Sequence, residues 1–173
     1  SSSASDAKQS GATWFPYNKG GDFRKWYGNE EWVIDWKDDG KRARDYGHLV
    51  PRSQKYMFLP EITWSKISSG HAAFRHKDKG HLFDVAGLCL FPNEEYTSLS
   101  LLAFCNSSVA QSFLSFLCPT LNFEVGGVCS MPLVDLDGVR DEVDCLASDC
   151  ISESLSDYSS FETSCDFKRH PLA

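Results

Sequence analysis

The sequence lacks the short motifs that assign a known chemistry to a chain. It holds no glycine-rich phosphate loop, no His-Glu-x-x-His zinc motif and no Gly-x-Ser-x-Gly nucleophile elbow. Serine, histidine and aspartate are plentiful, but a catalytic triad is a spatial arrangement that their order along the chain does not reveal. We therefore expect no catalytic residues in this chain.

Long apolar runs are also missing. The longest lies around residues 99–105 and is broken by Asn106, so it is far shorter than the roughly 20 residues that cross a bilayer. The chain opens with serines and lacks the basic and apolar stretches of a signal peptide. We expect a cytoplasmic protein without a membrane span, and a piece of something longer.

Closely spaced cysteines are absent as well. The seven cysteines include no Cys-x-x-Cys pair, and several have apolar neighbours, which is typical of reduced thiols in a cytosolic core. His71, His76 and His81 recur every five residues, and on a strand this odd spacing sends successive side chains to opposite faces. We therefore expect no metal site.

Positive charge is scarce in the second half of the chain. Residues 92–173 hold 3 Lys and Arg against 13 Asp and Glu, whereas residues 1–91 hold 14 against 11. The net charge of −7 thus combines a basic half at +3 with an acidic half at −10. Because binding of nucleic acid depends on the local field, a basic face on the first half is compatible with it.

What the sequence does hold is enough apolar material for a core. Of its 173 residues, 42% are hydrophobic and 13% are aromatic, which suits one packed domain. We expect a single compact α+β domain with a mainly β N-terminal half and a helical C-terminal half. A linker or loop over residues 1–13 would precede it.

The first half contains strand patterns. Residues 31–36 alternate in the manner of a strand. Residues 61–67 and 72–77 flank residues 68–70 in the pattern of a hairpin, whose glycine would supply a positive φ. Residues 82–91 are nearly all apolar and predict one buried strand.

The second half contains helix patterns. Ser107 and Ser108 suit the N-cap of a helix that Pro119 ends. Residues 121–125 alternate like a strand, and residues 138–156 predict a helix with acidic residues outside its apolar stripe. The apolar residues of the first helix that we expect on one core-facing side are Val109, Phe113, Phe116 and Leu117.

The most informative segment is residues 14–29, WFPYNKGGDFRKWYGN. It mixes aromatic rings with three cations, Lys19, Arg24 and Lys25. Cations neutralise phosphates, and aromatic rings stack on bases. This composition favours an interaction with nucleic acid.

Seven blocks, in order along nearly the whole chain, carry a resemblance to one known family. They are residues 14–21 (WFPYNKGG), 23–29 (FRKWYGN), 62–70 (ITWSKISSG), 83–87 (FDVAG), 101–107 (LLAFCNS), 119–126 (PTLNFEVG) and 160–167 (SFETSCDF). Together they resemble the C-terminal part of adenine-specific DNA methyltransferases of the BREX phage-defence type, and related blocks occur in fused restriction-modification enzymes. The chain departs from the pattern at Gly127, where an acidic residue is expected, and at Cys165, where a tryptophan is expected.

The resemblance implies a division of labour. In this family a separate catalytic half binds S-adenosylmethionine and presents an Asn-Pro-Pro-Tyr or Asn-Pro-Pro-Phe tetrapeptide to a flipped adenine. Neither that tetrapeptide nor a glycine-rich cofactor loop occurs here. Residues 14–173 would then be the target-recognition part, which holds and reads the duplex. Its partners would be double-stranded DNA, the missing catalytic half and other defence-system subunits.

Within that interpretation, individual residues receive roles. Gly20 and Gly21 would let the backbone approach the sugar-phosphate chain, and Arg75 would reach a guanine. Tyr17 and Trp64 would be the aromatic contacts. The expected phosphate-binding cations are Lys19, Arg24, Lys25 and Lys66. The hydroxyls expected to donate to phosphates or base edges are those of Ser65, Ser68 and Ser69.

Other interpretations stay open from the sequence. Trp32, Trp36 and Phe83 fit a core better than a contact surface, and the cations have acidic neighbours that could pair with them. The acidic helix could instead dock a subunit of a defence complex, which would make this a protein-interaction module. A third possibility is a small-ligand or carbohydrate module that uses the aromatic rings as platforms.

Overall fold

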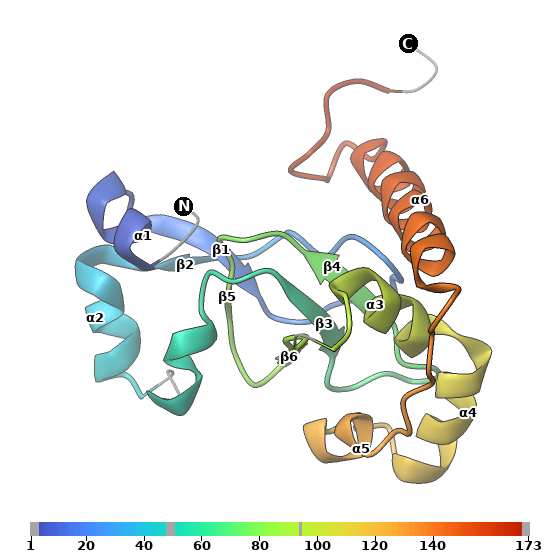
Figure 1. The fold of residues 1–173 in the computed structure, drawn as a ribbon. Coiled ribbons are helices and arrows are strands. Elements are labelled where there is room, and N and C mark those ends of the chain that lie inside the picture. The colour runs from blue at the N-terminus through green and yellow to red at the C-terminus, as the bar shows by residue number, and fades with distance from the viewer. Residues whose placement is uncertain (1–3, 48–50, 94, 171–173) are drawn as a thin grey trace.

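Two three-stranded sheets, with helices packed beside them, build the molecule (Figure 1). The structure is a computed structural model that describes residues 4–47, 51–93 and 95–170. Strands occupy the N-terminal half and the larger helices the C-terminal half. The predicted α+β class is confirmed.

The first sheet has the strand order β2-β1-β5. Its strands are β1 (Trp14–Asn18), β2 (Val33–Asp35) and β5 (Leu82–Phe83). β1 pairs antiparallel with β2 and parallel with β5. The helices beside it are α1 (Ala4–Ser10), α2 (Lys37–Asp45) and the 3₁₀-helix η1 (Pro51–Tyr56).

Part of the segment expected as a linker or loop is helical, because α1 finds a hydrophobic partner. Ala7 of α1 is buried in a small core that includes Phe15, Trp36 and Leu82. The core position predicted for Trp36 is thus confirmed. Trp32 was expected in the core too, but half of it is exposed. It lies just before β2 and does not belong to this cluster.

The second sheet is antiparallel throughout, in the order β4-β3-β6. Its strands are β3 (Glu61–Ser65), β4 (Phe74–Lys77) and β6 (Gly87–Leu90). The predicted hairpin of residues 61–67 and 72–77 is confirmed by the pairing of β3 with β4. Gly70 has no positive φ, since the connection is longer than a tight turn.

The apolar run of residues 82–91 forms two strands in different sheets, not one. Asp84 causes the break, because its Oδ1 accepts hydrogen bonds from Ala86 N at 2.7 Å and Gly87 N at 3.3 Å. Such a side-chain turn competes with a continuous strand. The chain therefore leaves β5 and enters β6 of the other sheet.

The second half consists of α3 (Ser98–Asn106), α4 (Ser108–Leu117), α5 (Val125–Cys129) and α6 (Arg140–Ser159). Ser107 is the N-cap of α4, and its Oγ accepts from Ala110 N at 3.1 Å, as predicted. The last helix is confirmed with slightly shifted ends. The expected strand of residues 121–125 is reduced to one bridge between Asn122 and Ile67, because Val125 already begins α5.

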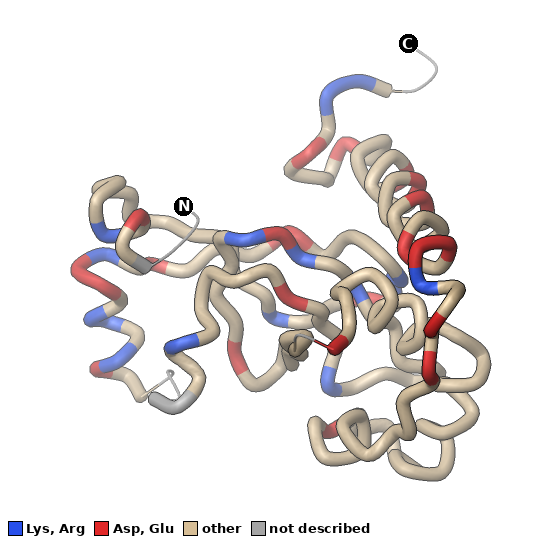
Figure 2. The backbone as a smooth tube through the Cα atoms, viewed as in Figure 1, with Lys and Arg blue, Asp and Glu red and all other residues tan. Residues whose placement is uncertain are grey.

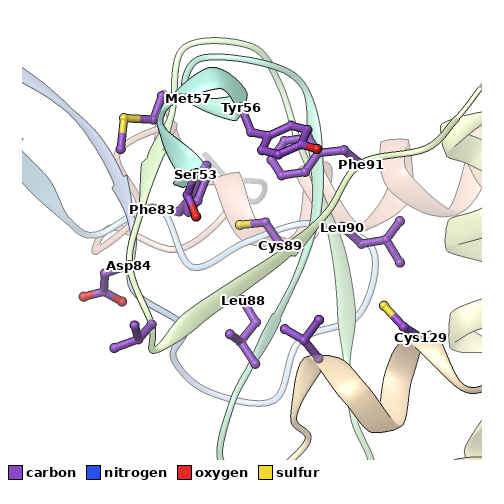
Figure 3. Close-up of a pocket in the computed structure, with 12 residues that line it drawn as sticks. Ser53, Tyr56, Met57, Phe83, Asp84, Leu88, Cys89, Leu90, Phe91 and Cys129 are labelled. Atoms are coloured by element: carbon purple, nitrogen blue, oxygen red, sulfur yellow. The ribbon is translucent and has the colours of Figure 1, made fainter. Parts of the chain in front are cut away.

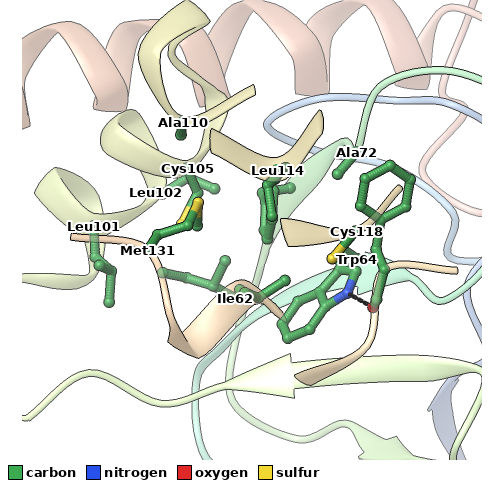
Figure 4. Close-up of a cluster of buried hydrophobic side chains, with 13 residues drawn as sticks. Ile62, Trp64, Ala72, Leu101, Leu102, Cys105, Ala110, Leu114, Cys118 and Met131 are labelled. Atoms are coloured by element: carbon green, nitrogen blue, oxygen red, sulfur yellow. Dashed lines mark hydrogen bonds between the residues drawn. The ribbon is translucent and has the colours of Figure 1, made fainter. Parts of the chain in front are cut away.

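The main core lies between the β4-β3-β6 sheet and these helices (Figure 4). Ile62, Trp64 and Phe74 contribute from the strands, and Leu102 and Leu114 from the helices. Since side chains alternate along a strand, the opposite side of the sheet carries Glu61, Thr63, Arg75 and Lys77 instead. All four are buried, so one side of the sheet is apolar and the other is a buried polar layer.

The side of α4 that meets the core is not the predicted one. Ala110 and Leu114 are buried, whereas the expected core residues Val109, Phe113, Phe116 and Leu117 are exposed. α3 and α4 meet at a bend of 68°, and this bend turns the Ala110 side of α4 towards the sheet. Within the described residues, no single helix has the length and apolar composition to span a membrane.

Candidate nucleic-acid interface

The chain turns at Gly20 and Gly21, just after β1, and this turn lies against the end of β3. Ser65 Oγ donates to Gly21 O at 2.8 Å, and Lys66 N donates to Ala86 O at 3.2 Å. Two segments far apart in the sequence are thereby held side by side. We call the surface that they form with the hairpin tip the hairpin face. Its residues are Lys19, Gly20, Gly21, Ser65, Lys66, Ser68 and Ser69.

Both glycines of the turn have positive φ, +77° at Gly20 and +139° at Gly21, and L side chains rarely adopt such a backbone. A Cβ at Gly20 would lie 2.9 Å from Ala86 O, and one at Gly21 would lie 2.7 Å from Asn29 Nδ2. Gly20 is buried and Gly21 is exposed. Glycine is required for close packing behind the turn, and Gly21 is the member that a ligand can approach.

Lys19 stands at the outer side of this turn. It is exposed, and its Nζ lies 5.3 Å from the centroid of the Trp32 ring. Among the described residues, no carboxylate forms an ion pair with it. Lys19 is therefore available to an anionic ligand, with an aromatic ring beneath it.

Exposed aromatic residues of the N-terminal segment were missed as candidates. Trp14 and Phe23 are more than half exposed, and Trp32 is half exposed. Along β1 the side chains alternate, with Trp14 outward and Phe15 inward. This period-two pattern could have assigned Trp14 to the outer side, whereas nothing local in the sequence separates Trp32 from the core tryptophan Trp36.

Lys66 and the hairpin tip form the other end of the hairpin face. Lys66 Nζ pairs with Glu124 at 2.9 Å, and both side chains are partly exposed. Ser68 donates through its backbone N to Leu121 O at 3.0 Å and through Oγ to His71 O at 3.0 Å. Ser69 and Gly70 are exposed. The tip is therefore outside, and its conformation is fixed by the segment before α5.

Arg24 and Lys25 lie away from the hairpin face, at the helical half of the molecule. Arg24 Nη1 lies 3.4 Å from Asp157 Oδ2, and its guanidinium is 5.2 Å from the centroid of the Tyr158 ring. Lys25 Nζ donates to Asn106 O at 2.9 Å, at the C-terminus of α3. These cations tie the N-terminal segment to α3 and α6, and the structure does not group them with Lys19 and Lys66.

Trp64 and Arg75 are inside the molecule, with no exposed surface. Trp64 Nε1 donates to Phe123 O at 2.8 Å within the main core. Arg75 Nη2 donates to Ser65 Oγ at 3.2 Å, and Nη1 donates to Arg24 O at 3.2 Å. A side chain without exposed surface cannot stack on a base or reach a groove, so neither residue is retained as a direct contact.

The Arg75 charge nevertheless lies directly behind the hairpin face. Burial lowers the pKa of Arg75 to about 10, so the guanidinium is still protonated at neutral pH. It donates to Ser65 Oγ, which in turn donates to Gly21 O. A buried cation thus orients the hydroxyl that joins the two segments.

Tyr17 lies on β1, just before the glycine turn, and pairs with Leu82 of β5. Its ring is half-buried. Burial and the nearby Asp84 charge raise the pKa of Tyr17 well above its ordinary value, so the phenol keeps its proton. Tyr17 acts as a positioning residue for the segment that follows β5.

The buried polar layer holds an ionic cluster around Glu30. Lys77 Nζ lies 2.6 Å from Glu30 Oε1 and also donates to the carbonyls of Gly28 and Asn29. His81 Nε2 lies 2.8 Å from Glu30 Oε2. Burial alone would raise the pKa of Glu30, but hydrogen bonds and charges from His81 and Lys77 lower it. For His81 burial is outweighed by Glu30, which raises the pKa of the imidazole.

A second buried carboxyl, Glu61, has no cation in contact. Its Oε1 accepts from Asn18 Nδ2 at 3.2 Å, while Oε2 has no hydrogen-bond partner among the described residues. The same Asn18 amide donates to Thr63 Oγ1. Burial raises the pKa of Glu61 to about 7. In the described part of the chain, no three acidic, histidine or cysteine side chains are arranged to hold a metal ion.

A pocket of about 590 Å³ lies beside β6 (Figure 3). Tyr56, Phe83 and Phe91 line it together with aliphatic side chains and Cys89. The Tyr56 ring stacks on Phe91 with centroids 4.7 Å apart, and Lys55 Nζ lies 4.7 Å from the Tyr56 ring. Each of the two stacked rings therefore has one face covered by the other.

The departure from the family pattern at Gly127 has a local structural reason. A Cβ at this position of α5 would collide with Cys118 Sγ. Glycine therefore permits the close approach of α5 to the end of α4. Cys165 is exposed, so a cysteine in place of the expected tryptophan leaves no cavity in the core.

No protein-family model matches this chain. The chain is 43% identical over 169 residues, which are 92% of its length, to the adenine-specific methyltransferase PglX of Lacticaseibacillus casei (strain Zhang). It is 35% identical over 161 residues, again 92% of its length, to the adenine-specific methyltransferase BrxX of Escherichia coli O9:H4 (strain HS). The matches span only 14% and 13% of these two relatives. The resemblance seen in the sequence is confirmed.

Proposed function

Because this chain matches a segment of BREX-type adenine-specific methyltransferases, we propose that it is the DNA target-recognition segment of such an enzyme. The observation that carries the proposal is the hairpin face, where Lys19 and Lys66 flank an exposed backbone turn and an exposed loop tip. An enzyme that acts on a base inside a duplex needs a surface that holds the surrounding DNA. The hairpin face would supply this surface.

Different residues of the hairpin face would serve different parts of the duplex. Lys19 and Lys66 would neutralise phosphates, which positions the DNA without reading its sequence. Gly21 has no side chain, so a phosphate oxygen can approach its backbone. Ser69 at the tip would reach base edges, where a hydroxyl can donate or accept. Specificity would therefore reside in the tip and affinity at its flanks.

Two internal interactions would set the strength of binding. Lys66 is held by Glu124 at 2.9 Å, so contact with a phosphate would replace one anionic partner by another. This exchange lowers the gain from Lys66 and restrains binding to any DNA sequence. Arg75 would act through Ser65, which it orients from behind, and its buried charge adds to the positive potential at the turn.

The methyl donor of this reaction class, S-adenosylmethionine, does not fit the described residues. Folds that bind such cofactors place them at the carboxyl ends of several parallel strands, beside a glycine-rich turn into a helix. Here the parallel pairing of β1 with β5 joins only two residue pairs, and Gly20–Gly21 leads into no helix. No step of methyl transfer is therefore assigned to these residues.

Exchange of the segment between enzymes tests the proposal. In a chimera, this chain replaces the matched segment of the Lacticaseibacillus casei methyltransferase, and the adenines methylated in genomic DNA are mapped by sequencing. A recognition segment predicts that the methylated sequence changes from that of the parent enzyme. A chimera that methylates the parental sequence would contradict the proposal.

The chain by itself provides a second test. Fluorescence anisotropy with a labelled duplex at low and moderate salt should show binding that weakens steeply as salt increases. Absence of binding at low salt would favour a protein-interaction module that uses the acidic outer side of α6.

A further inference from the structure

The outward side of α4 is an apolar stripe with no covering element among the described residues. Val109, Phe113, Phe116 and Leu117 follow the i, i+4, i+7, i+8 spacing of one helix face, and all four are exposed. Phe116 is 83% exposed. Solvent-facing positions of a helix normally carry charged or polar side chains, so this stripe needs an explanation.

The side of α4 next to this stripe already satisfies the core of this molecule. Ala110 and Leu114 are fully buried against the sheet, and Gln111 Nε2 donates to Cys105 O at 3.1 Å. The outward stripe is therefore additional to the apolar side that folding uses. The serines of α4 occupy its remaining side, so the helix has a core side, a polar side and an exposed apolar side.

The exposed apolar surface extends beyond α4. Leu121, in the segment that leads into α5, is more than half exposed. Ile67 joins it from the hairpin, since it bridges to Asn122. We call this surface the α4 face. Its residues are Ile67, Val109, Phe113, Phe116, Leu117 and Leu121.

From this geometry we propose that the α4 face docks against the remainder of the methyltransferase polypeptide. The inference rests on the proposed function, because it requires a larger enzyme around this chain. The matched segment makes up only 14% and 13% of the two relatives, so most of such an enzyme lies outside these residues. A group of exposed apolar side chains of this kind marks a contact with protein.

The absence of charge along α4 argues against DNA or a membrane surface as the occupant of this helix. From Thr97 to Phe123 the sequence contains no Lys, Arg, Asp or Glu, and Figure 2 shows α4 without a coloured residue. DNA requires cations. Helices that lie in a membrane surface carry Lys or Arg on their polar side. An uncharged surface of a neighbouring protein unit is the occupant that this chemistry fits.

Docking here would also place the hairpin tip. Ile67 and Leu121 belong to the α4 face, and Ser68, which belongs to the hairpin face, is bound to Leu121 through its backbone. The two surfaces therefore share one short segment. An enzyme that holds the α4 face fixes the orientation in which the tip meets the duplex.

Side-chain footprinting of the chimeric methyltransferase tests this proposal. Hydroxyl-radical oxidation of Phe113 and Phe116 is compared between the chain alone and the chimera in which it replaces the matched segment of the Lacticaseibacillus casei enzyme. We expect oxidation of both phenylalanines to fall at least fivefold in the chimera. Oxidation of Trp14, which lies on the first sheet, should not change. Equal oxidation of Phe116 in the two proteins would overturn the proposal.

A pair of variants supplies an independent readout. Phe116→Lys should leave the melting temperature of the chain alone unchanged and lower that of the chimera, because a charge would be buried at the docked face. Leu146→Lys, at an exposed position on α6, should alter neither protein. A concentration-dependent dimer of the chain alone that Phe116→Lys abolishes would assign the face to a second copy and overturn the proposal.

DNA binding separates this inference from the proposed function. Phe116→Lys should not change the affinity of the chain alone for duplex DNA. If the footprint is protected but the chain alone binds no DNA, the docking face stands and the recognition role fails. If the chain alone binds DNA and Phe116 remains oxidised in the chimera, the recognition role stands and the docking face fails.

Discussion

Among the cations of the basic half, two pairs differ in a way that the sequence does not reveal. Arg75 and Lys77 are buried on β4, where they donate to backbone carbonyls, Ser65 and Glu30. Lys19 and Lys66 lie on the outside, next to a glycine turn and a loop tip. The first pair holds the N-terminal segment onto the sheet, and the second pair is available to a ligand. The cations of a basic sequence can therefore either stabilise the fold or be available to a ligand.

The comparison also explains the polar layer beside the β4-β3-β6 sheet. Burial of a charge is costly unless hydrogen bonds and an opposite charge compensate it. Lys77 has three acceptors, two carbonyls and Glu30. The external cations have weaker constraints, since Lys66 shares an exposed ion pair and Lys19 only an aromatic ring. Loss of an internal cation should destabilise the molecule strongly, whereas loss of an external one should not.

Removal of Lys77 should give the largest effect. Lys77→Met leaves Glu30 and the Gly28 and Asn29 carbonyls buried without their donor, so the free energy of unfolding should fall by about 3–5 kcal/mol. Urea denaturation followed by circular dichroism measures this loss. The control is Lys79→Met at an exposed position, which should change stability by less than about 0.5 kcal/mol. Equal effects of the two variants would remove the distinction between internal and external cations.

The pH dependence of Glu61 should give the next effect. Its pKa is raised from 4.5 to about 7 by burial in the folded protein, so the folded state binds this proton more tightly than the unfolded state. The stabilisation is complete below pH 4.5 and is lost as the pH rises towards 7, by about 3 kcal/mol in total. Glu61→Gln cannot lose a proton, so its stability should decline less over this range.

Glu30 and His81 titrate in both proteins, so the difference between wild type and Glu61→Gln isolates Glu61. Unfolding free energies measured at pH 4.5, 6 and 7.5 should show the variant gaining on the wild type at each step. Parallel curves would mean that Glu61 is not the carboxyl that takes up a proton on folding.

Gly20→Ala should have an intermediate effect. A Cβ at Gly20 would lie 2.9 Å from Ala86 O at a φ of +77°, so the substitution should cost about 2 kcal/mol. Gly70→Ala is the matched control, because Gly70 has an ordinary φ and nothing lies within 4 Å of its Cβ position. It should be neutral or slightly stabilising in thermal melts. An unchanged melting temperature for Gly20→Ala would show that alanine adopts the positive φ of this turn without cost.

The sequence predicted elements whose signals are local. The hairpin formed by β3 and β4, the Ser107 cap and the long helix α6 each depend on residues close together along the chain. Ser107 is an example, since capping requires only its own side chain and the amide of Ala110. The resemblance to methyltransferases was also readable, because it rests on several blocks in a fixed order.

Features that depend on distant contacts were predicted less well. The apolar stripe of α4 predicts a buried side but not what buries it, and the bend after α3 turned Ala110 inward instead. A charged residue such as Arg75 is expected at the surface, yet its alternation with Phe74 along β4 places it in the buried polar layer. Its hydrogen-bond acceptors belong to residues 24 and 65, which are distant in the sequence. Such partners follow from tertiary packing, which no short pattern encodes.

Lys19 and Lys66 should contribute least to the stability of the fold and most to the affinity for DNA. The most direct test measures the affinity of the chain for a duplex at several salt concentrations, for the wild type and for Lys19→Gln with Lys66→Gln. We expect wild-type binding, an unfolding free energy of the double variant within about 1 kcal/mol of the wild type, and a slope of log K against log salt reduced by about 2. An unchanged slope, or a wild-type chain that binds no duplex at low salt, would contradict this expectation.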